Sequence, residues 1–69
     1  MDDMKRFLRI KEASRITGVP RSSLYELMRD DPTFPKLVKL NKRTKAFVEE
    51  ELAEWIEQRI AERDSKRAA

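Results

Sequence analysis

A glycine and a proline two residues apart, Gly18 and Pro20, constrain the first half of the chain more than any other feature. Glycine accepts the left-handed backbone that ends a helix, so Gly18 predicts the end of a short helix over residues 11–17. Proline suits the first turn of a helix, where its missing N–H has no partner, so Pro20 predicts the start of a second helix ending near Arg29. Two short helices across such a turn are typical of a helix-turn-helix motif.

The predicted second helix has one apolar and one polar face. Apolar residues at spacings of three and four share its inward face. With the first helix included, the inward residues are predicted to be Ala13, Ile16, Leu24, Leu27 and Met28. The outward face and its flanks are polar or hydrogen-bonding: Ser22, Ser23, Tyr25, Glu26 and Arg29. The second helix of such a motif enters the major groove of DNA, and a ten-residue helix about 15 Å long suits a groove about 12 Å wide.

After the second helix the sequence predicts a loop and then a β-hairpin. Two prolines and paired aspartates predict a loop over residues 30–35, with Phe34 anchored in the core. Alternating apolar residues predict strands over residues 36–40 and 44–47. In the turn between them, Asn41 is the residue that best tolerates a positive φ.

The predicted hairpin carries several cations and no acid: Lys36, Lys39, Lys42, Arg43 and Lys45. Lysines often protect a sheet edge from aggregation, which is one interpretation. Five cations exceed that need, so contact with a polyanionic backbone is the interpretation that we favour.

Residues 49–63 are predicted to form a long helix that supports the other elements from behind. Glutamates in its first turn are favoured by the helix dipole. An apolar stripe is predicted to be core: Leu52, Trp55, Ile56 and Ile60. Only the end near Ile60 is a candidate surface for a protein partner. Residues 1–6 and 65–69 are predicted to be flexible, and residues 7–10 to be an extended lead-in.

Composition excludes several classes of function. A chain of 69 residues forms one domain with a small core. It holds no cysteine and no histidine, so we expect no disulfide, no metal site, no cofactor and no enzyme activity. No apolar run approaches the roughly 18 residues of a membrane span, and no secretory signal is visible. We therefore expect a cytoplasmic, nucleoid-associated chain with neither a membrane nor a small-molecule ligand as partner.

Charge is distributed unevenly along the sequence. Residues 5–48 carry 12 basic and 4 acidic side chains, a net charge of +8. Residues 49–64 carry 2 basic and 7 acidic side chains, a net charge of −5. Charges that merely solvated a small domain would be more evenly mixed. A basic lobe attracts a polyanion and an acidic helix is repelled by it, so the asymmetry favours nucleic acid as the partner.

An ordered set of short motifs covers most of the chain: Leu8-Arg-Ile-Lys-Glu-Ala13, Thr17-Gly-Val-Pro-Arg-Ser-Ser-Leu-Tyr25, Phe34-Pro-Lys36, Val38-Lys-Leu40, Glu51-Leu-Ala-Glu-Trp-Ile56 and Arg59-Ile-Ala-Glu-Arg63. Through this set the chain resembles the AlpA family of prophage regulators and excisionase-like proteins, which are related to the MerR DNA-binding domain. The resemblance implies a mainly α fold with a small β-hairpin, a MerR-like winged helix-turn-helix over residues 7–64. It also implies that the second helix reads the major groove and that the hairpin is the wing.

The resemblance places Arg21, Ser22, Ser23 and Tyr25 in the recognition helix and Arg43 in the wing. Three positions depart from the family pattern: Pro20 replaces the usual serine N-cap, the wing turn lacks glycine, and Val48 replaces a residue that is often polar or basic. Combining the resemblance with the residue analysis gives the expected DNA-binding set: Arg21, Ser22, Ser23, Tyr25, Glu26, Arg29, Lys39, Lys42, Arg43 and Lys45.

Two side chains in this set have alternative interpretations. Tyr25 is either half-buried core or a phosphate-contacting phenol. Glu26 could accept a hydrogen bond from a cytosine amino group, or pair within its helix with Arg29 or Ser22, which we favour.

The function implied is sequence-specific binding of double-stranded DNA, as a transcriptional regulator or an excisionase of a prophage or integrated element. An integrase or further copies of the chain are candidate partners on the DNA. The alternative function is a protein–protein adaptor or inhibitor that uses the acidic C-terminal helix.

Overall fold

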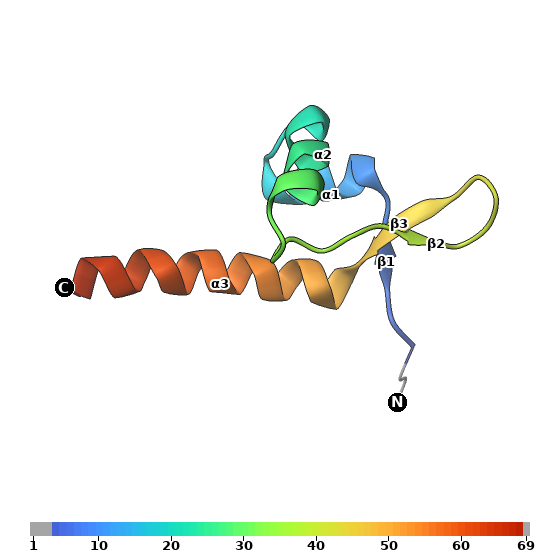
Figure 1. Ribbon diagram of the computed structural model, residues 1–69. Coiled ribbons are helices and arrows are strands. Elements are labelled where there is room, and N and C mark those ends of the chain that lie inside the picture. Colours follow the sequence, from blue (N-terminus) through green and yellow to red (C-terminus); the bar gives the residue numbers. More distant parts are fainter. Residues whose placement is uncertain (1–3, 69) are drawn as a thin grey trace.

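The computed structural model describes residues 4–68 and is mainly helical with a small antiparallel sheet (Figure 1). This confirms the predicted class of secondary structure. The elements in chain order are β1 (Phe7–Leu8), α1 (Ile10–Thr17), α2 (Arg21–Asp30), β2 (Val38–Lys39), β3 (Lys45–Val48) and α3 (Glu49–Ala68).

Gly18 ends α1 as predicted. Its φ of 76° and ψ of 7° lie in the left-handed region, and its N–H donates to the Ser14 carbonyl at 2.9 Å. The Ser14 hydroxyl donates to the Val19 carbonyl at 2.7 Å, and Val19 N–H donates to Thr17 Oγ1 at 3.1 Å. These bonds satisfy backbone groups of a three-residue turn that ends at Pro20, the residue directly before α2.

The sheet has the strand order β1-β3-β2, with both pairs antiparallel. β2 and β3 form the predicted hairpin. The lead-in, expected only to be extended, supplies a third strand whose Leu8 lies opposite Phe47. Helix α1 begins at Ile10, one residue earlier than predicted, so Ile10 belongs to the helix and not to the lead-in.

Phe34 is anchored in the core, as predicted, with 2% of its surface exposed. Its ring meets Phe47 of β3 edge-on at 5.7 Å between centroids and Trp55 of α3 edge-on at 4.9 Å. Such edge-to-face pairs are favourable beyond their buried area. Phe34 thereby joins the loop after α2 to both the sheet and α3, while Leu24 and Leu52 complete the packing from the helices.

The turn of the hairpin is closed by a side chain. Asn41 was expected to supply a positive φ, but among residues 4–68 only Gly18 has one. Instead, Asn41 Oδ1 accepts hydrogen bonds from the N–H groups of Arg43 at 2.9 Å and Thr44 at 2.8 Å. A side-chain oxygen that mimics a backbone carbonyl makes the turn without glycine.

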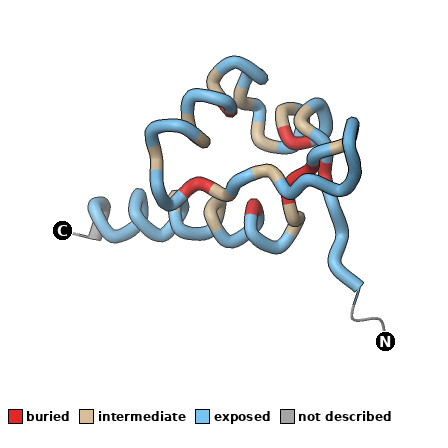
Figure 2. The backbone as a smooth tube through the Cα atoms, turned by 45° about the vertical axis from the view of Figure 1, so that its right-hand side comes forward, coloured by how far each residue is buried: buried red, intermediate tan, exposed pale blue. Residues whose placement is uncertain are grey.

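Helix α3 extends to Ala68, five residues beyond its predicted end at Arg63. At 1.5 Å per residue its 20 residues span about 30 Å, and its second half projects past the α1–α2 pair (Figure 1). Figure 2 shows that this half is largely exposed. Ile60 is 40% exposed, so the prediction that Ile60 belongs to the core is wrong. The flexibility predicted for the tail stays a prediction, and residues 1–3 and 69 lie outside the described residues.

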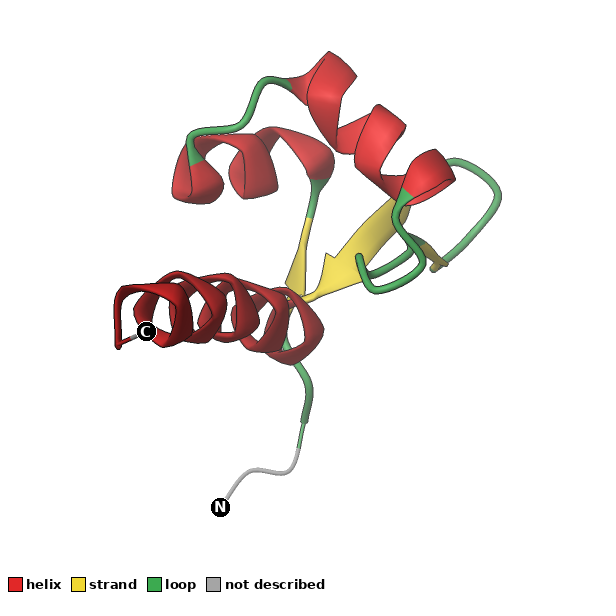
Figure 3. Ribbon diagram, turned by 60° about the vertical axis from the view of Figure 1, so that its left-hand side comes forward, coloured by secondary structure: helices red, strands yellow, loops and turns green. Residues whose placement is uncertain are grey.

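The prediction that Ile16 is buried is wrong, because 57% of its surface is exposed. Figure 3 shows α3 on the opposite side of the molecule from α1 and α2, with the strands between them at one end. Ile16 therefore reaches the rim of a mostly apolar hollow of about 300 Å³ between α1 and α3, which Leu52, Ala53 and Ile56 also line. Helical periodicity predicted which face of α1 points inward, but not that packing against this face ends before Ile16.

Candidate nucleic-acid interface

Helix α2 has Leu24 fully buried, with Leu27 and Met28 half-buried beside it. Its opposite face is exposed and carries Ser22, Glu26 and Arg29. Of the two predicted flanks, one carries Arg21 and Tyr25, both exposed, with Tyr25 at 52%. Ser23 is half-buried on the other flank, because residues 21 and 25 share a side of a helix and residue 23 does not.

Tyr25 lies beside the hairpin. It lines a surface hollow of about 260 Å³ whose other walls include Arg43 and Lys45. We call this the Tyr25 hollow: Arg9, Ile10, Tyr25, Leu37, Arg43 and Lys45. Because Ser22 and Tyr25 are neighbours three residues apart on the helix, the exposed face of α2 adjoins the hairpin cations. The structure thus brings the two predicted groups onto one surface.

The hairpin places two lysines directly opposite each other. Lys39 of β2 and Lys45 of β3 are cross-strand partners, and both are exposed. Paired residues lie on one face of the sheet, and Lys45 shares that face with Phe47, which packs into the core. Like charges in this position destabilise a sheet. The pair therefore favours binding of an anion over simple protection of a sheet edge.

Ion pairing separates the cations of the described residues into two groups. Lys5, Arg6, Arg29, Arg59 and Arg63 each lie within 4.0 Å of a carboxylate oxygen. No acid pairs with the other predicted DNA-contacting cations within residues 4–68: Arg21, Lys39, Lys42, Arg43 and Lys45.

Arg29 differs from the other predicted contacts. Its Nε and Nη2 donate to the two carboxylate oxygens of Asp30 at 2.9 and 3.1 Å. The hydrogen bond from Arg29 lowers the pKa of Asp30 below its ordinary value. The favoured pairing of Glu26 with Arg29 or Ser22 is therefore wrong, since Arg29 bonds the adjacent aspartate and Glu26 has no hydrogen-bonding partner in the described part of the chain.

The start of α2 lacks a side-chain cap. Pro20 is the N-cap residue and has no side-chain acceptor, and the first intrahelical bond runs from Leu24 N–H to the Pro20 carbonyl at 3.0 Å. The preceding N–H groups, of Arg21, Ser22 and Ser23, have no intrachain acceptor in the described structure. Such groups carry partial positive charge and donate readily to anions.

Arg9 is a component that the sequence prediction missed. It precedes α1 and lines the Tyr25 hollow together with Arg43, although 34 positions separate the two residues in the sequence. The sequence signal that could have identified Arg9 was its position directly before a predicted helix, as a basic residue with no acidic partner. That signal is weak, because only the pairing of β1 with β3 brings Arg9 to the hairpin.

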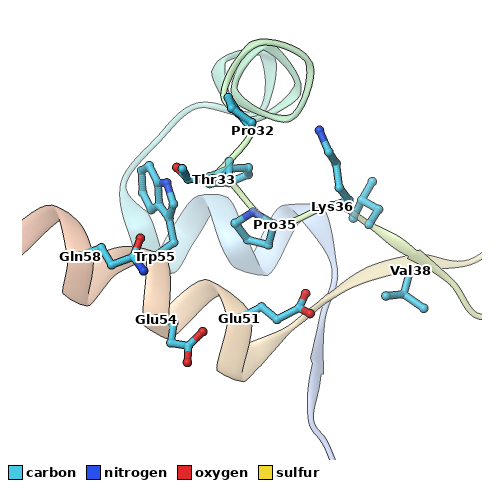
Figure 4. Close-up of a pocket in the computed structure, with 11 residues that line it drawn as sticks. Pro32, Thr33, Pro35, Lys36, Val38, Glu51, Glu54, Trp55 and Gln58 are labelled. Carbon is cyan, nitrogen blue, oxygen red and sulfur yellow. The ribbon is translucent and has the colours of Figure 1, made fainter.

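The other face of the hairpin borders an acidic hollow of about 440 Å³ (Figure 4). Glu51, Glu54 and Trp55 reach it from α3, and Pro35 lies opposite them in the segment before β2, while the Lys36 side chain points away from the glutamates toward α2. The Lys36 ammonium donates to the Met28 carbonyl and so is held away from the hairpin tip. The basic and acidic parts of the sequence therefore lie on different sides of the hairpin, with the carboxylates of α3 behind the cationic surface.

Residues 4–68 contain no group of three or more acidic side chains arranged to hold a metal ion. In the same part of the chain, no helix combines the length and the apolar character needed to cross a bilayer.

A mainly helical domain with a small antiparallel sheet and one cationic surface is compatible with a small DNA-binding domain. Comparison with family models gives a match over residues 6–60 to the family described as "Prophage CP4-57 regulatory protein (AlpA)". The chain belongs to this AlpA family of prophage regulatory proteins.

A curated relative is similar over most of the chain. An uncharacterised protein of Enterobacteria phage P4, ORF88, is 39% identical over 59 residues, which cover 86% of this chain and 66% of the phage protein. The chain therefore spans slightly less than two thirds of that relative. No solved structure gives a significant match.

Proposed function

We propose that this chain binds double-stranded DNA sequence-specifically as a winged helix-turn-helix protein. Helix α2 is the recognition helix in the major groove, and the β2–β3 hairpin is a wing on the phosphate backbone. The observation that carries the proposal is the Tyr25 hollow, where α2 meets the unpaired wing cations Arg43 and Lys45. One duplex that touches the exposed face of α2 lies within reach of both.

The residues divide by role. Ser22 and Arg21, at the exposed start of α2, reach base edges and the adjacent phosphates. Glu26 lies on the same outward face without a protein partner in the described residues, which supports a base contact for it. Lys39, Lys42, Arg43 and Lys45 neutralise phosphates, as does Arg29 when it exchanges its exposed bond with Asp30 for one with DNA.

Membership of a family of prophage regulators indicates the biological setting. Binding within a prophage or integrated element would either control transcription of a gene such as an integrase gene, or bend attachment-site DNA during excision. An integrase and further copies of the chain are the proposed partners on that DNA.

The experiment is duplex binding measured by fluorescence anisotropy as a function of salt. We expect affinity to fall steeply between about 50 and 200 mM salt, because phosphate contacts release counterions. Arg43→Glu should weaken binding at least about tenfold, since it converts a phosphate contact into a repulsion. Lys66→Glu is the matched control: it makes the same charge change on the exposed distal part of α3 and should weaken binding far less.

Equal effects of the two substitutions would show a non-specific charge effect and would contradict the assignment of the β2–β3 hairpin as a wing. Absence of salt-dependent binding would favour the alternative function, an adaptor that uses α3. That alternative predicts a protein complex that survives high salt and depends on residues near Ile60.

A further inference from the structure

Two cations outside the predicted DNA-binding set, Arg9 and Lys11, lie close to Arg21 at the starts of α1 and α2. Arg9, Lys11 and Arg21 line a surface hollow of about 440 Å³, together with Ile10 and Glu12. We call it the Arg21 hollow. None of the three cations has a carboxylate partner in residues 4–68, whereas Lys5 and Arg6, a few residues earlier, are paired with Glu50 and Glu49.

The Arg21 hollow adjoins the Tyr25 hollow. Arg9 and Ile10 line both, so Arg9 stands between the start of α2 on one side and the wing residues on the other. Ile10 is half-buried and packs against the core. The two hollows therefore form one cationic strip that begins at Lys11, passes Arg9 and ends at Arg43.

One carboxylate lies in this strip, and its position is fixed by the start of α1. Glu12 Oε1 accepts the backbone N–H of Arg9 at 3.2 Å. This bond uses the backbone of Arg9 and leaves its guanidinium available. With Arg9, Lys11 and Arg21 around a single carboxylate, the hollow keeps a net positive charge.

We propose that Arg9 and Lys11, with Arg21, form a second backbone-binding site for the duplex, beside the recognition helix and separate from the wing. The proposal rests on the proposed function. It adds that the DNA backbone crosses the start of α1 and that Arg9 links this contact to the wing contact. The occupant is the sugar-phosphate backbone of the same double helix, because the strip is continuous with the surface assigned to it.

The experiment compares Arg9→Ala with Arg15→Ala on a random-sequence duplex, by anisotropy over a salt series. Arg15 is the matched control: it lies in the last turn of α1, is exposed and unpaired in the described residues, and lines neither hollow. We expect Arg9→Ala to weaken binding several-fold and to reduce the slope of log K against log salt by about 1, and Arg15→Ala to leave that slope unchanged.

Lys11→Ala provides an independent second variant, since Lys11 lies in the first turn of α1 and not at its N-cap. Circular dichroism melts establish that each variant is folded. If Arg43→Ala reduces the salt slope while Arg9→Ala and Lys11→Ala do not, the second site is wrong and the proposed function stands. If the unmodified chain shows no salt-dependent duplex binding, both are wrong.

Discussion

Lys39 and Lys45 face each other across the β2–β3 pair, on the sheet face that also carries Phe47. A sheet that evolved only for stability would place an acid or a neutral residue at one of these positions, because like charges directly opposite are unfavourable. The retained repulsion is relieved when a phosphate approaches both ammonium groups. Replacing either lysine should therefore change the free energy of unfolding and the affinity for DNA in opposite directions.

Lys39→Glu tests this opposition. The variant creates a cross-strand ion pair with Lys45, so we expect the free energy of unfolding to rise by up to about 1 kcal/mol. Duplex affinity should fall, because the wing loses one cation and gains an anion. Thermal melts and anisotropy on the same samples measure both effects. A variant that is less stable and binds DNA as well as the original would show that the lysine pair is structural.

The two serines of α2 should differ in their effect on specificity. Ser22 lies on the exposed face, whereas Ser23 is half-buried on the flank away from Tyr25. We expect Ser22→Ala to change the preference for bases in the bound site, and Ser23→Ala to leave that preference nearly unchanged. Competition between duplexes that differ at single base pairs measures it. A larger change from Ser23→Ala would mean that α2 presents its other flank to the groove.

Phe34→Ala should unfold a large fraction of the protein. Phe34 is 2% exposed and makes edge-on contacts with both Phe47 and Trp55. Truncating a buried phenylalanine costs about 3–5 kcal/mol, which is a large part of the stability of a small domain. Ile60→Ala is the control, since that side chain lies largely outside the core. Thermal unfolding followed by circular dichroism should show a large drop for the first variant and a small one for the second.

Asp31 should make stability depend on acidic pH. Its Oδ1 accepts the Thr33 hydroxyl at 2.6 Å and the Thr33 N–H at 2.9 Å, and these bonds lower the pKa of Asp31 below its ordinary value. A lowered folded-state pKa gives stabilisation that is complete above the unfolded-state pKa of about 3.9 and is lost as pH falls through the folded-state pKa.

Urea unfolding between about pH 2 and 6 measures this dependence. Asp31→Ala and Thr33→Val should both be less sensitive to acid than the original chain. Sensitivity to acid would remain in part, because the pKa of Asp30 is also lowered, by its bond from Arg29. Identical pH profiles for the original chain and both variants would contradict the role assigned to Asp31.

Local signals in the sequence predicted much of this fold. Gly18 fixed the end of α1 because only glycine takes its backbone conformation without strain. The spacing of Leu24, Leu27 and Met28 gave the inward face of α2, and Phe34 between two prolines was identified as an anchor. In each case the determining interaction lies within a few residues of the signal.

What the sequence could not predict depends on contacts between distant segments. The pairing of Leu8 with Phe47 involves strands too short to show a period, and it alone brings Arg9 beside Arg43. Ile16 is exposed because of where α3 lies, and the sequence of α1 does not predict the position of α3. Glu26 and Arg29 were compatible with pairing by their spacing, yet Arg29 reaches the nearer Asp30 with two hydrogen bonds.

The most direct measurement of the central claim is a titration of the ¹⁵N-labelled chain with a DNA duplex at low salt, followed by amide chemical shifts. The claim that α2 and the wing bind one duplex together predicts that residues 21–29 and 39–45 shift with the same apparent affinity, while the acidic residues of α3 do not move. Shifts centred on α3, or on only one of α2 and the hairpin, would contradict it.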